Sequence, residues 1–429
     1  MERDDSTEQA DKSPPTGRLA VRALVLFANF FLIILAYYQV KAASRSLVLE
    51  HFNPDAFPWL WIVTALVLLA LIGAYHRIVE RYARLNVVLA SCLVFIVLLV
   101  AFRIWFELHG PSAAIGFYIL VDIFSVVLVE QFWSLTNTIN TGNEGRRSYW
   151  FVATGGPVGG IIAGVVVGAL IRHTPVTTPD LLLTCAGFLG LIIVLNLWMA
   201  RLGLYRELAP SPGADALVAR RGWRALLESR YLVLIAAALL CAQLAQPVVE
   251  YQFLSAVDAA YPERESRTAF IGDFYLYLNA ASILVNVLLT PLIHRYLGMV
   301  AGLCTQPISL LLFSLGFIAQ PVLWMAGAMK IADRGLSYSI NRASKELLYI
   351  PIDPVRTYQA KAWIDMLGYR LFKVLGSAAI LFLVGTLGVG VGGLGWLTVA
   401  ICAAWLAVIA LLAREHARLS AALPAAAQA

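Results

Sequence analysis

The sequence predicts an all-α polytopic membrane protein, with twelve transmembrane helices arranged as two halves of six. The 429-residue chain is 60% hydrophobic and only 14% charged, and its mean hydropathy of +0.77 excludes an ordinary soluble protein. Apolar runs about as long as a bilayer crossing recur throughout the chain, and only helices or closed barrels can cross a bilayer. Basic residues gather in alternate loops between these runs, a pattern typical of helical membrane proteins.

The apolar runs define the helices in chain order. They place the spans at about 19–42, 57–78, 85–106, 114–139, 149–171, 180–201, 230–256, 269–293, 298–318, 321–347, 359–386 and 391–414. Residues 1–18 are polar and include Pro14 and Pro15, which favours a disordered tail over a cleavable signal. The expected organisation is this tail, a bundle of six helices at 19–201, a linker at 202–229, a second bundle at 230–415 and a final tail at 416–429.

The charges of the loops predict the orientation of the chain. Basic residues follow every second span, for example at Arg81, Arg146, Arg221 and Arg295, whereas the opposite loops are nearly uncharged or mixed, as in GTLGVGVGGLG. Because basic loops stay in the cytoplasm, both termini and the linker are expected there. The net charge of +6 therefore indicates orientation, and no nucleic-acid partner is expected.

The longest loop divides the chain into halves that resemble each other weakly. HRIVERYARLNVVLASC follows the second span, and LIHRYLGMVAGLCT follows the eighth, its counterpart. Two parallel six-helix halves joined by a long cytoplasmic loop are the plan of the major facilitator fold. In that plan the first, fourth, seventh and tenth spans line a central cavity.

Polar residues concentrate on the four spans that this plan assigns to the cavity. They are Asn29, Gln39, Lys41 and Arg45 on the first, Asp122 and Glu130 on the fourth, Gln243, Gln246 and Glu250 on the seventh, and Lys330, Asp333 and Arg334 on the tenth. Those on the seventh share one helix face, and the basic pairs on the first and tenth are spaced i, i+4. Walls of both signs indicate a cavity that binds an anion and moves by exchanging internal ion pairs. The alternative is that these charges form fixed bridges between helices or lie at the membrane surface.

The stretch from Lys330 to Gly376 is the most highly charged part of this apolar half, and apolar runs flank it on both sides. A membrane tolerates ionisable side chains poorly, so those on its helices need a partner, a pathway or a ligand. Arg370 and Lys373 project to one side of the eleventh span, with Asp365 about two turns before Lys373. These charges are therefore candidates for binding an anionic substrate.

Other motifs predict packing more than chemistry. The fifth span places Gly156, Gly160, Gly164 and Gly168 four residues apart, a spacing that allows close helix packing. The five cysteines all fall in apolar runs without CxxC pairing and are expected to be free packing residues. No Walker loop, HExxH or GxSxG motif occurs, so neither an ATP-driven pump nor an enzyme is expected, and no metal or cofactor is expected.

The segment SYSINRASKELLYIPIDPVRTYQAKAWIDMLGYRLFKVLG resembles the ATP/ADP translocase type of nucleotide transporter, found in plastids and obligate intracellular bacteria. The likeness lies in the KELLYIP run, the QAKAWID run and the lysine that follows, and it extends to VVEYQFLSAVDAAYPERESRTAFIGDF. The resemblance implies nucleotide transport and carries the family's functional positions onto Arg45, Asp122, Glu250 and Lys373. The first two depart from the family's lysine and glutamate. Arginine makes bidentate phosphate contacts that lysine cannot, so the first change can retune the substrate.

Together the residues and the resemblance predict a secondary active transporter that exchanges ATP/ADP-type nucleotides by alternating access. The further residues expected to bind substrate are Lys330, Arg334, Lys41, Arg370 and Gln246. Those expected to serve coupling or gating are Glu130, Asp273, Asp365 and Asp333. Trp133 or Tyr251 could stack on a base, although packing is the commoner role of such aromatics.

The expected partners are an anionic, phosphorylated metabolite and the lipid of a bacterial inner membrane, with the chain as a monomer. Two alternatives remain open. One is a proton-coupled transporter of another organic anion, with Glu250 or Asp122 as the protonation site. The other is a receptor or partner subunit that has the fold but does not transport.

Overall fold

The computed structural model describes residues 16–205, 226–227, 229–349, 352, 360–361, 363–364 and 368–422. All regular structure within these residues is helical. Most of the predicted linker lies outside the described residues, as do most of the first predicted tail and the end of the last one.

The helices before the linker pack together as a first group. They are α1 (Thr16–His51), α2 (Ala56–Arg81), α3 (Arg84–Leu108), α4 (Gly110–Ile139), α5 (Gly142–His173) and α6 (Leu181–Arg201), with the 3-10 turn η1 (Thr178–Asp180) before α6. α1 contacts α4, α5 and α6. It also continues well beyond residue 42, where the first span is predicted to end. The predicted end is wrong. Lys41 and Arg45 interrupt the apolar run, and this suggested that the span ends there. Both side chains face protein, however, and the helix continues past them.

The helices after the linker form a second group. They are α8 (Arg230–Ala260), α9 (Arg264–Leu284), α10 (Thr290–Tyr296), α11 (Gly298–Ala319), α12 (Leu323–Leu336), α13 (Arg342–Leu348), α15 (Tyr369–Ile380) and α16 (Gly395–Ala422). π-Helical segments continue several of these helices: η2 (Val285–Leu289) joins α9 to α10, η3 (Ser337–Asn341) joins α12 to α13, and η5 (Leu381–Thr386) extends α15. Such segments often occur at functional sites, and η3 directly follows the charged part of α12.

Ten helices or continuous helical runs in the described part of the chain are long and apolar enough to cross a membrane. The described apolar part of α2, Ala56–Leu71, is shorter. The run from α12 to α13, which contains Lys330, Asp333 and Arg334, is not among the ten either. The prediction of an all-α protein with many membrane-length helices is therefore confirmed.

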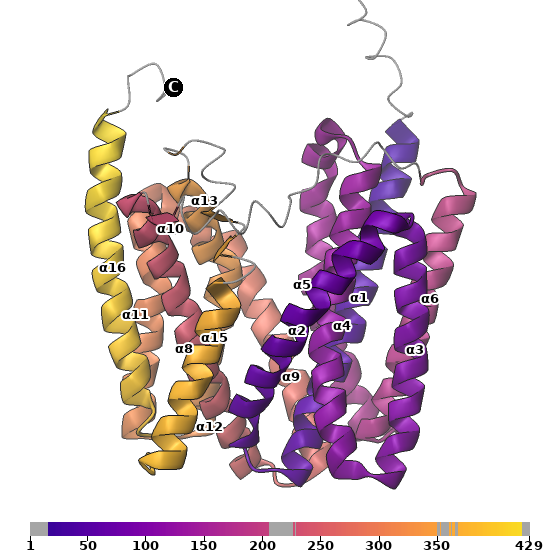
Figure 1. Cartoon of the computed structure of the whole chain (residues 1–429), viewed down its shortest axis with the longest axis horizontal. Helices are drawn as coiled ribbons and strands as arrows, with labels where there is room; N and C mark the ends of the chain where they lie inside the picture. Colours follow the sequence, from indigo (N-terminus) through magenta and orange to yellow (C-terminus); the bar gives the residue numbers. More distant parts are fainter. Residues whose placement is uncertain are drawn as a thin grey trace, which may run out of the picture.

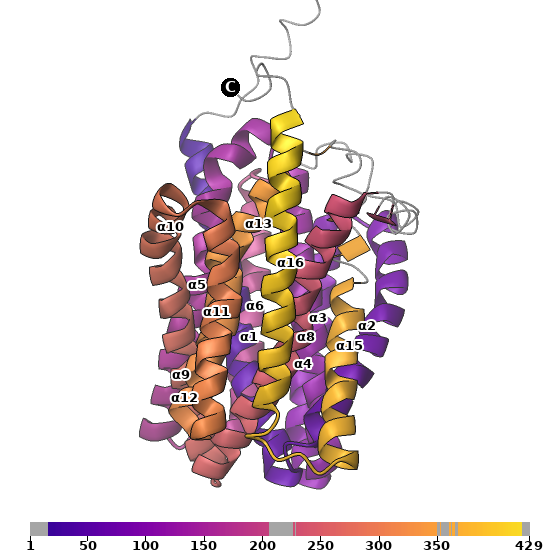
Figure 2. The same ribbon diagram turned by 90° about the vertical axis from the view of Figure 1, so that its left-hand side faces the viewer.

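The two groups lie side by side, with the first drawn in indigo to magenta and the second in rose to yellow (Figure 1). They meet mainly where α5 and α1 contact α9, and where α2 contacts α15. On the outer side of the second group α16 packs against α11 (Figure 2). The described beginning of α1 and the end of α16 lie at the same end of the molecule (Figure 1), which is called the terminal end below. The opposite end is called the distal end.

Glycines on α5 bring its backbone close to helices on both sides. A methyl group added at Gly159 would lie 2.5 Å from the Phe31 carbonyl oxygen of α1, and one at Gly164 would lie 2.6 Å from the Gly272 carbonyl oxygen of α9. The predicted close packing of this span is therefore confirmed, and on the α9 side it joins the two groups. All five cysteines are free, also as predicted.

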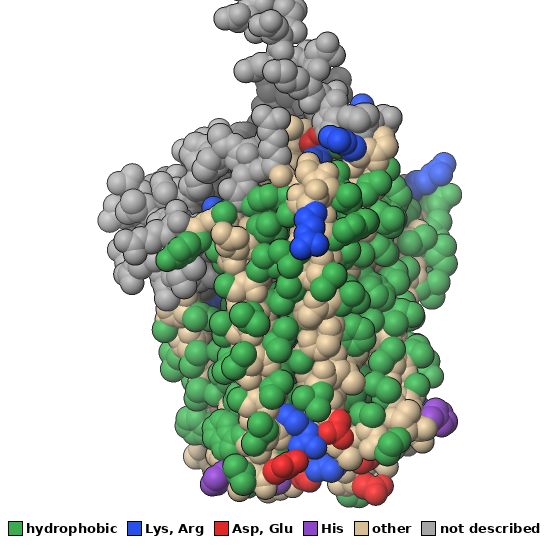
Figure 3. Space-filling model, turned by 90° about the vertical axis from the view of Figure 1, so that its right-hand side faces the viewer, with side chains coloured by type: hydrophobic (Ala, Val, Ile, Leu, Met, Phe, Trp, Pro, Cys, Tyr) green, Lys and Arg blue, Asp and Glu red, His purple; other side chains and the backbone are tan. Residues whose placement is uncertain are grey.

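The outer surface of the first group is apolar, as expected for contact with lipid. Figure 3 shows a broad hydrophobic face, with basic side chains toward its upper edge and a mixed cluster of charges near its lower edge. Exposed apolar side chains on α3 and α6 include Leu93, Val97, Ile104 and Val194. Because water would disfavour so large an apolar surface, this face indicates a protein embedded in a bilayer.

Candidate functional site

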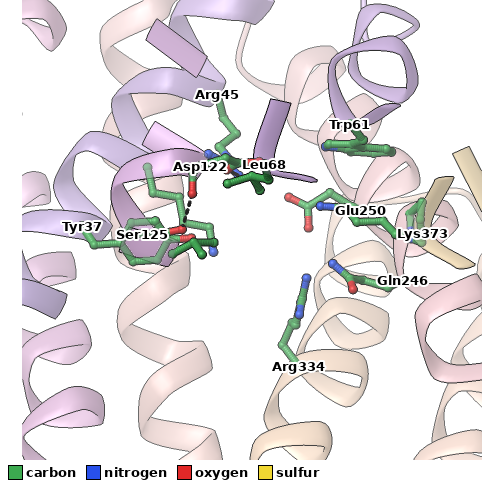
Figure 4. Close-up of a pocket in the computed structure, with 13 residues that line it drawn as sticks. Tyr37, Arg45, Trp61, Leu68, Asp122, Ser125, Gln246, Glu250, Arg334 and Lys373 are labelled. Atoms are coloured by element: carbon green, nitrogen blue, oxygen red, sulfur yellow. Dashed lines mark hydrogen bonds and ion pairs between the residues drawn. The ribbon is translucent and has the colours of Figure 1, made fainter. Parts of the chain in front are cut away.

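A cavity of about 170 Å³ lies between the two groups of helices (Figure 4). The first group contributes residues of α1, α2 and α4, and the second contributes residues of α8, α12 and α15. The lining residues are Tyr37, Lys41, Arg45, Trp61, Leu68, Asp122, Ser125, Val126, Gln246, Pro247, Glu250, Arg334 and Lys373. Four of these are basic and two are acidic, so the lining carries an excess of positive charge.

The wall from the first group is built on Arg45 and Asp122. Arg45 Nη2 lies 3.4 Å from Asp122 Oδ1, and Arg45 Nη1 donates a hydrogen bond of 2.9 Å to Ser44 Oγ. The guanidinium also stands 4.7 Å from the centre of the Tyr118 ring. Among the described residues Arg45 Nε has no hydrogen-bond partner. The long, single contact to Asp122 leaves the guanidinium able to bind a second anion.

The wall from the second group is built on Glu250. Its carboxylate forms an ion pair with the ammonium of Lys330 on α12. Glu250 is 8% exposed and lines the cavity, whereas Lys330 is 2% exposed and lies behind it. The structure therefore brings both predicted residues together, but only Glu250 meets the cavity directly.

Asp333 and Arg334 follow Lys330 on α12, and their side chains point in different directions. Arg334 lines the cavity, with its Nε 3.6 Å from Asp333 Oδ2. Asp333 is 3% exposed, and its backbone oxygen accepts a hydrogen bond of 3.0 Å from Gln306 on α11. Asp333 thus helps to anchor α12 to α11, and Arg334 presents its charge to the cavity.

Lys373 and Gln246 complete the wall near Glu250, where Figure 4 shows them on the same side of the cavity as Arg334. No ion pair of Lys373 is present among the described residues. Asp365, a predicted gating residue about two turns before Lys373 in the sequence, lies outside the described residues. Arg370 is half-buried and, unlike Lys373, does not line the cavity.

Two predicted gating residues also lie away from the cavity. Glu130 is on α4 but is not part of the lining. Asp273 is on α9 and forms an ion pair with Arg172 at the end of α5. The sequence predicts a gating role for both residues. Whether a side chain faces the cavity depends on how its helix is rotated about its axis, and the sequence of one span does not reveal this rotation.

The aromatic residues of the cavity are not those that the sequence suggested. Trp133 packs on Phe30 and Tyr149, and Tyr251 donates a hydrogen bond of 2.5 Å to Asp55 Oδ1. The lining contains Tyr37 and Trp61 in their place. Tyr37 could have been found because it precedes Lys41 by one helical turn, whereas Trp61 lies on a span that the fold plan does not assign to the cavity.

At the distal end, polar contacts join the two groups. Arg264 Nη1 at the start of α9 lies 3.0 Å from Glu50 Oε1 near the end of α1, and Ser46 Oγ donates a hydrogen bond of 2.9 Å to the Arg264 carbonyl oxygen. On the same helix, Glu265 Oε2 accepts a hydrogen bond of 2.7 Å from Thr178 Oγ1. With the Arg172 pair already described, we define the distal network as Ser46, Glu50, Arg172, Thr178, Arg264, Glu265 and Asp273.

A family model described as TLC ATP/ADP transporter matches residues 112–329 and 319–416 of this chain. The matched parts together run from 112 to 416, which is well over half of the 429 residues. They include most of the cavity lining, from Asp122 to Lys373.

Two curated relatives are named as nucleotide carriers. The chain is 24% identical to ADP,ATP carrier protein 1 of Chlamydia trachomatis, over 83% of this chain and 80% of that protein. It is also 24% identical to ADP,ATP carrier protein 4 of Rickettsia conorii, over 62% of this chain and 60% of that protein.

Solved transporter structures share the fold. The nucleoside transporter NupG superposes with a TM-score of 0.62 at 13% identity, covering 92% of this chain and 98% of that chain. A POT family transporter in complex with a thioalcohol-conjugated peptide gives a TM-score of 0.64 at 12% identity, covering 92% and 96%. At these identities the likeness establishes a major facilitator-like arrangement of helices and not a shared substrate.

Proposed function

Because this chain belongs to the TLC ATP/ADP transporter family, we propose that it exchanges ATP/ADP-type nucleotides across a membrane by alternating access. It is an integral membrane transporter and not an enzyme. The observation that carries the proposal is the cavity between the two groups, lined by four basic and two acidic side chains.

The charges of the cavity suit the phosphates of a nucleotide. Arg45 on one wall and Lys373 on the other can approach a phosphate chain from two sides, and Arg334 can add a third cation. Ionised donors form the strongest hydrogen bonds to phosphate, and a guanidinium can bind it in bidentate fashion. Asp122 and Glu250 neutralise part of this charge in the empty cavity, through Arg45 and Lys330.

The same charges explain why transport would be an exchange. Closing the empty cavity to water would bury a surplus of cations, which is costly in a low-dielectric environment. A bound nucleotide supplies the missing negative charge, so the loaded protein can close and reorient. After it releases its nucleotide, the protein can return to its first orientation only when a second anion has bound. This requirement couples the import of one nucleotide to the export of another.

For the membrane arrangement, we propose twelve spans, with α2 and the α12–α13 run added to the ten apolar helices. The two groups would then be the two six-helix halves, 19–201 and 230–415, joined by the linker 202–229. The terminal end would face the cytoplasm of a bacterium, and the protein would work as a monomer. The distal network supports a state that is closed at the opposite end.

Proteoliposomes test this function directly. Vesicles preloaded with ADP should take up labelled ATP, whereas empty vesicles should not, because exchange needs an internal anion. An imposed proton gradient should leave the rate unchanged. Uptake that follows the gradient without internal nucleotide would favour the proton-coupled alternative, and the absence of both binding and uptake for all nucleotides would refute the proposal.

A further inference from the structure

Lys41 stands in the cavity wall within a cage of three tyrosines. Its ammonium nitrogen lies 5.2 Å from the ring centre of Tyr37, 5.1 Å from that of Tyr38 and 4.8 Å from that of Tyr275. The Tyr38 and Tyr275 rings also meet each other edge to face, with centres 4.9 Å apart. Lys41 is half-buried and lines the cavity.

The tyrosine cage stabilises the ammonium of Lys41 in a different way from the ion pair that stabilises Lys330. Glu250 cancels the charge of Lys330 in an ion pair. Tyrosine rings attract an ammonium through their negative faces, and this lowers the cost of burying its charge without cancelling it in an ion pair. No carboxylate is paired with Lys41 among the described residues. An anion in the cavity therefore does not compete with a described carboxylate for this ammonium.

The cage joins the two groups of helices. Tyr37, Tyr38 and Lys41 belong to α1, whereas Tyr275 belongs to α9 and is 3% exposed. Lys41 lies five residues before Ser46 on α1, which is about 8 Å along the helix from this member of the distal network. One wall of the cage thus depends on the contact between the two groups.

We infer that Lys41 is a phosphate-binding residue of the cavity and that Tyr275 positions it from across the interface. The inference rests on the proposed function, because it takes the phosphates of a nucleotide as the anion. The ammonium donates hydrogen bonds to phosphate oxygens, and its contribution grows with the number of negative charges on the ligand. Tyr275 acts through Lys41 by fixing the direction of its long, flexible side chain.

The test is nucleotide affinity of the purified full-length protein, measured with ATP, ADP, adenosine and inorganic phosphate. Lys41→Gln should weaken ATP binding by about tenfold or more and ADP binding less, while adenosine binding stays the same. Lys41→Arg should recover part of the loss because it keeps the charge. Lys361→Gln is the control for removing a lysine, since Lys361 pairs with Glu346 outside the cavity.

The role of Tyr275 is tested separately. Tyr275→Phe keeps the ring and should bind ATP as the wild type does, whereas Tyr275→Leu should weaken ATP binding and leave adenosine binding unchanged. Tyr277→Leu is a matched control on the same helix, because Tyr277 is 63% exposed and outside the cage.

The outcomes separate the inference from the proposed function. If the wild type binds nucleotides and Lys41→Gln binds ATP equally well, or loses ATP and adenosine to the same extent, the inference is overturned and the proposed function stands. Equal ATP affinities for Tyr275→Leu and the wild type remove the positioning role. If the wild type binds inorganic phosphate but no nucleotide, the proposed function and the inference fail together.

Discussion

Replacing Glu250 by glutamine should damage both stability and exchange. Glutamine keeps nearly the same shape but removes the negative charge that pairs with Lys330. Lys330 is 2% exposed, and among the described residues no other carboxylate forms an ion pair with its ammonium. The substitution therefore leaves a buried cation without its counter-charge.

The size of the effect follows from this burial. Removing one member of a buried ion pair costs about 3–5 kcal/mol, because the other charge stays in a low-dielectric site. Replacing both residues, Glu250→Gln with Lys330→Met, leaves no isolated charge and should recover most of the lost stability. It should not recover exchange, because Glu250 also lines the cavity.

Thermal unfolding of the purified protein and exchange in proteoliposomes measure the two effects. Glu107→Gln is the control, since Glu107 is 66% exposed in its pair with Arg103 and should change stability by less than about 1 kcal/mol. A single Glu250→Gln variant with wild-type stability and rate would refute the reasoning. Restored exchange in the double variant would mean that the pair is only structural.

Three further predictions concern other parts of the chain. Lys373→Ala should weaken ATP binding more than ADP binding in a titration, and both more than adenosine, with partial recovery in Lys373→Arg. Gly164→Ala should lower stability by about 1–3 kcal/mol in thermal unfolding, because its methyl group would meet the α9 backbone, whereas Gly187→Ala, which meets nothing within 4 Å, should not. Burial alone would raise the pKa of Glu144, but the Thr141 backbone N–H and Arg22 lower it below its usual value. Its stabilising effect should therefore be present above the unfolded-state pKa and lost as the pH falls through the folded-state one, and Glu144→Gln should flatten unfolding curves measured across that acid range.

Much of the fold could be predicted because it depends on patterns that one sequence contains. Apolar runs predict the membrane helices, and the glycine spacing of the fifth span predicts its close packing, which Gly156 and Gly164 confirm. The first span was predicted too short because hydropathy treats Lys41 and Arg45 as the end of a span. Hydropathy cannot tell a helix that leaves the membrane from one that turns polar residues toward a protein cavity.

Some features of the cavity could be predicted from the sequence and others could not. Arg45, Asp122, Glu250 and Lys373, the four positions that the resemblance singled out in the sequence, all line it. The pairing of Glu250 with Lys330 could not be predicted, because it depends on how α8 and α12 rotate against each other. The charge pattern gave no sign of a tyrosine cage, since one of its walls lies more than two hundred residues along the chain from the others.

The distal network also has a consequence for the speed of the transport cycle. It contains partly exposed ion pairs, such as Arg264 with Glu50, whose side chains are 33% and 30% exposed. Exposed pairs of this kind contribute only about 0–1 kcal/mol each and weaken as salt rises. These ion pairs therefore add little to the barrier for opening at this end. The ionic strength of the medium at this end would then set how long the protein rests in the closed state between turnovers.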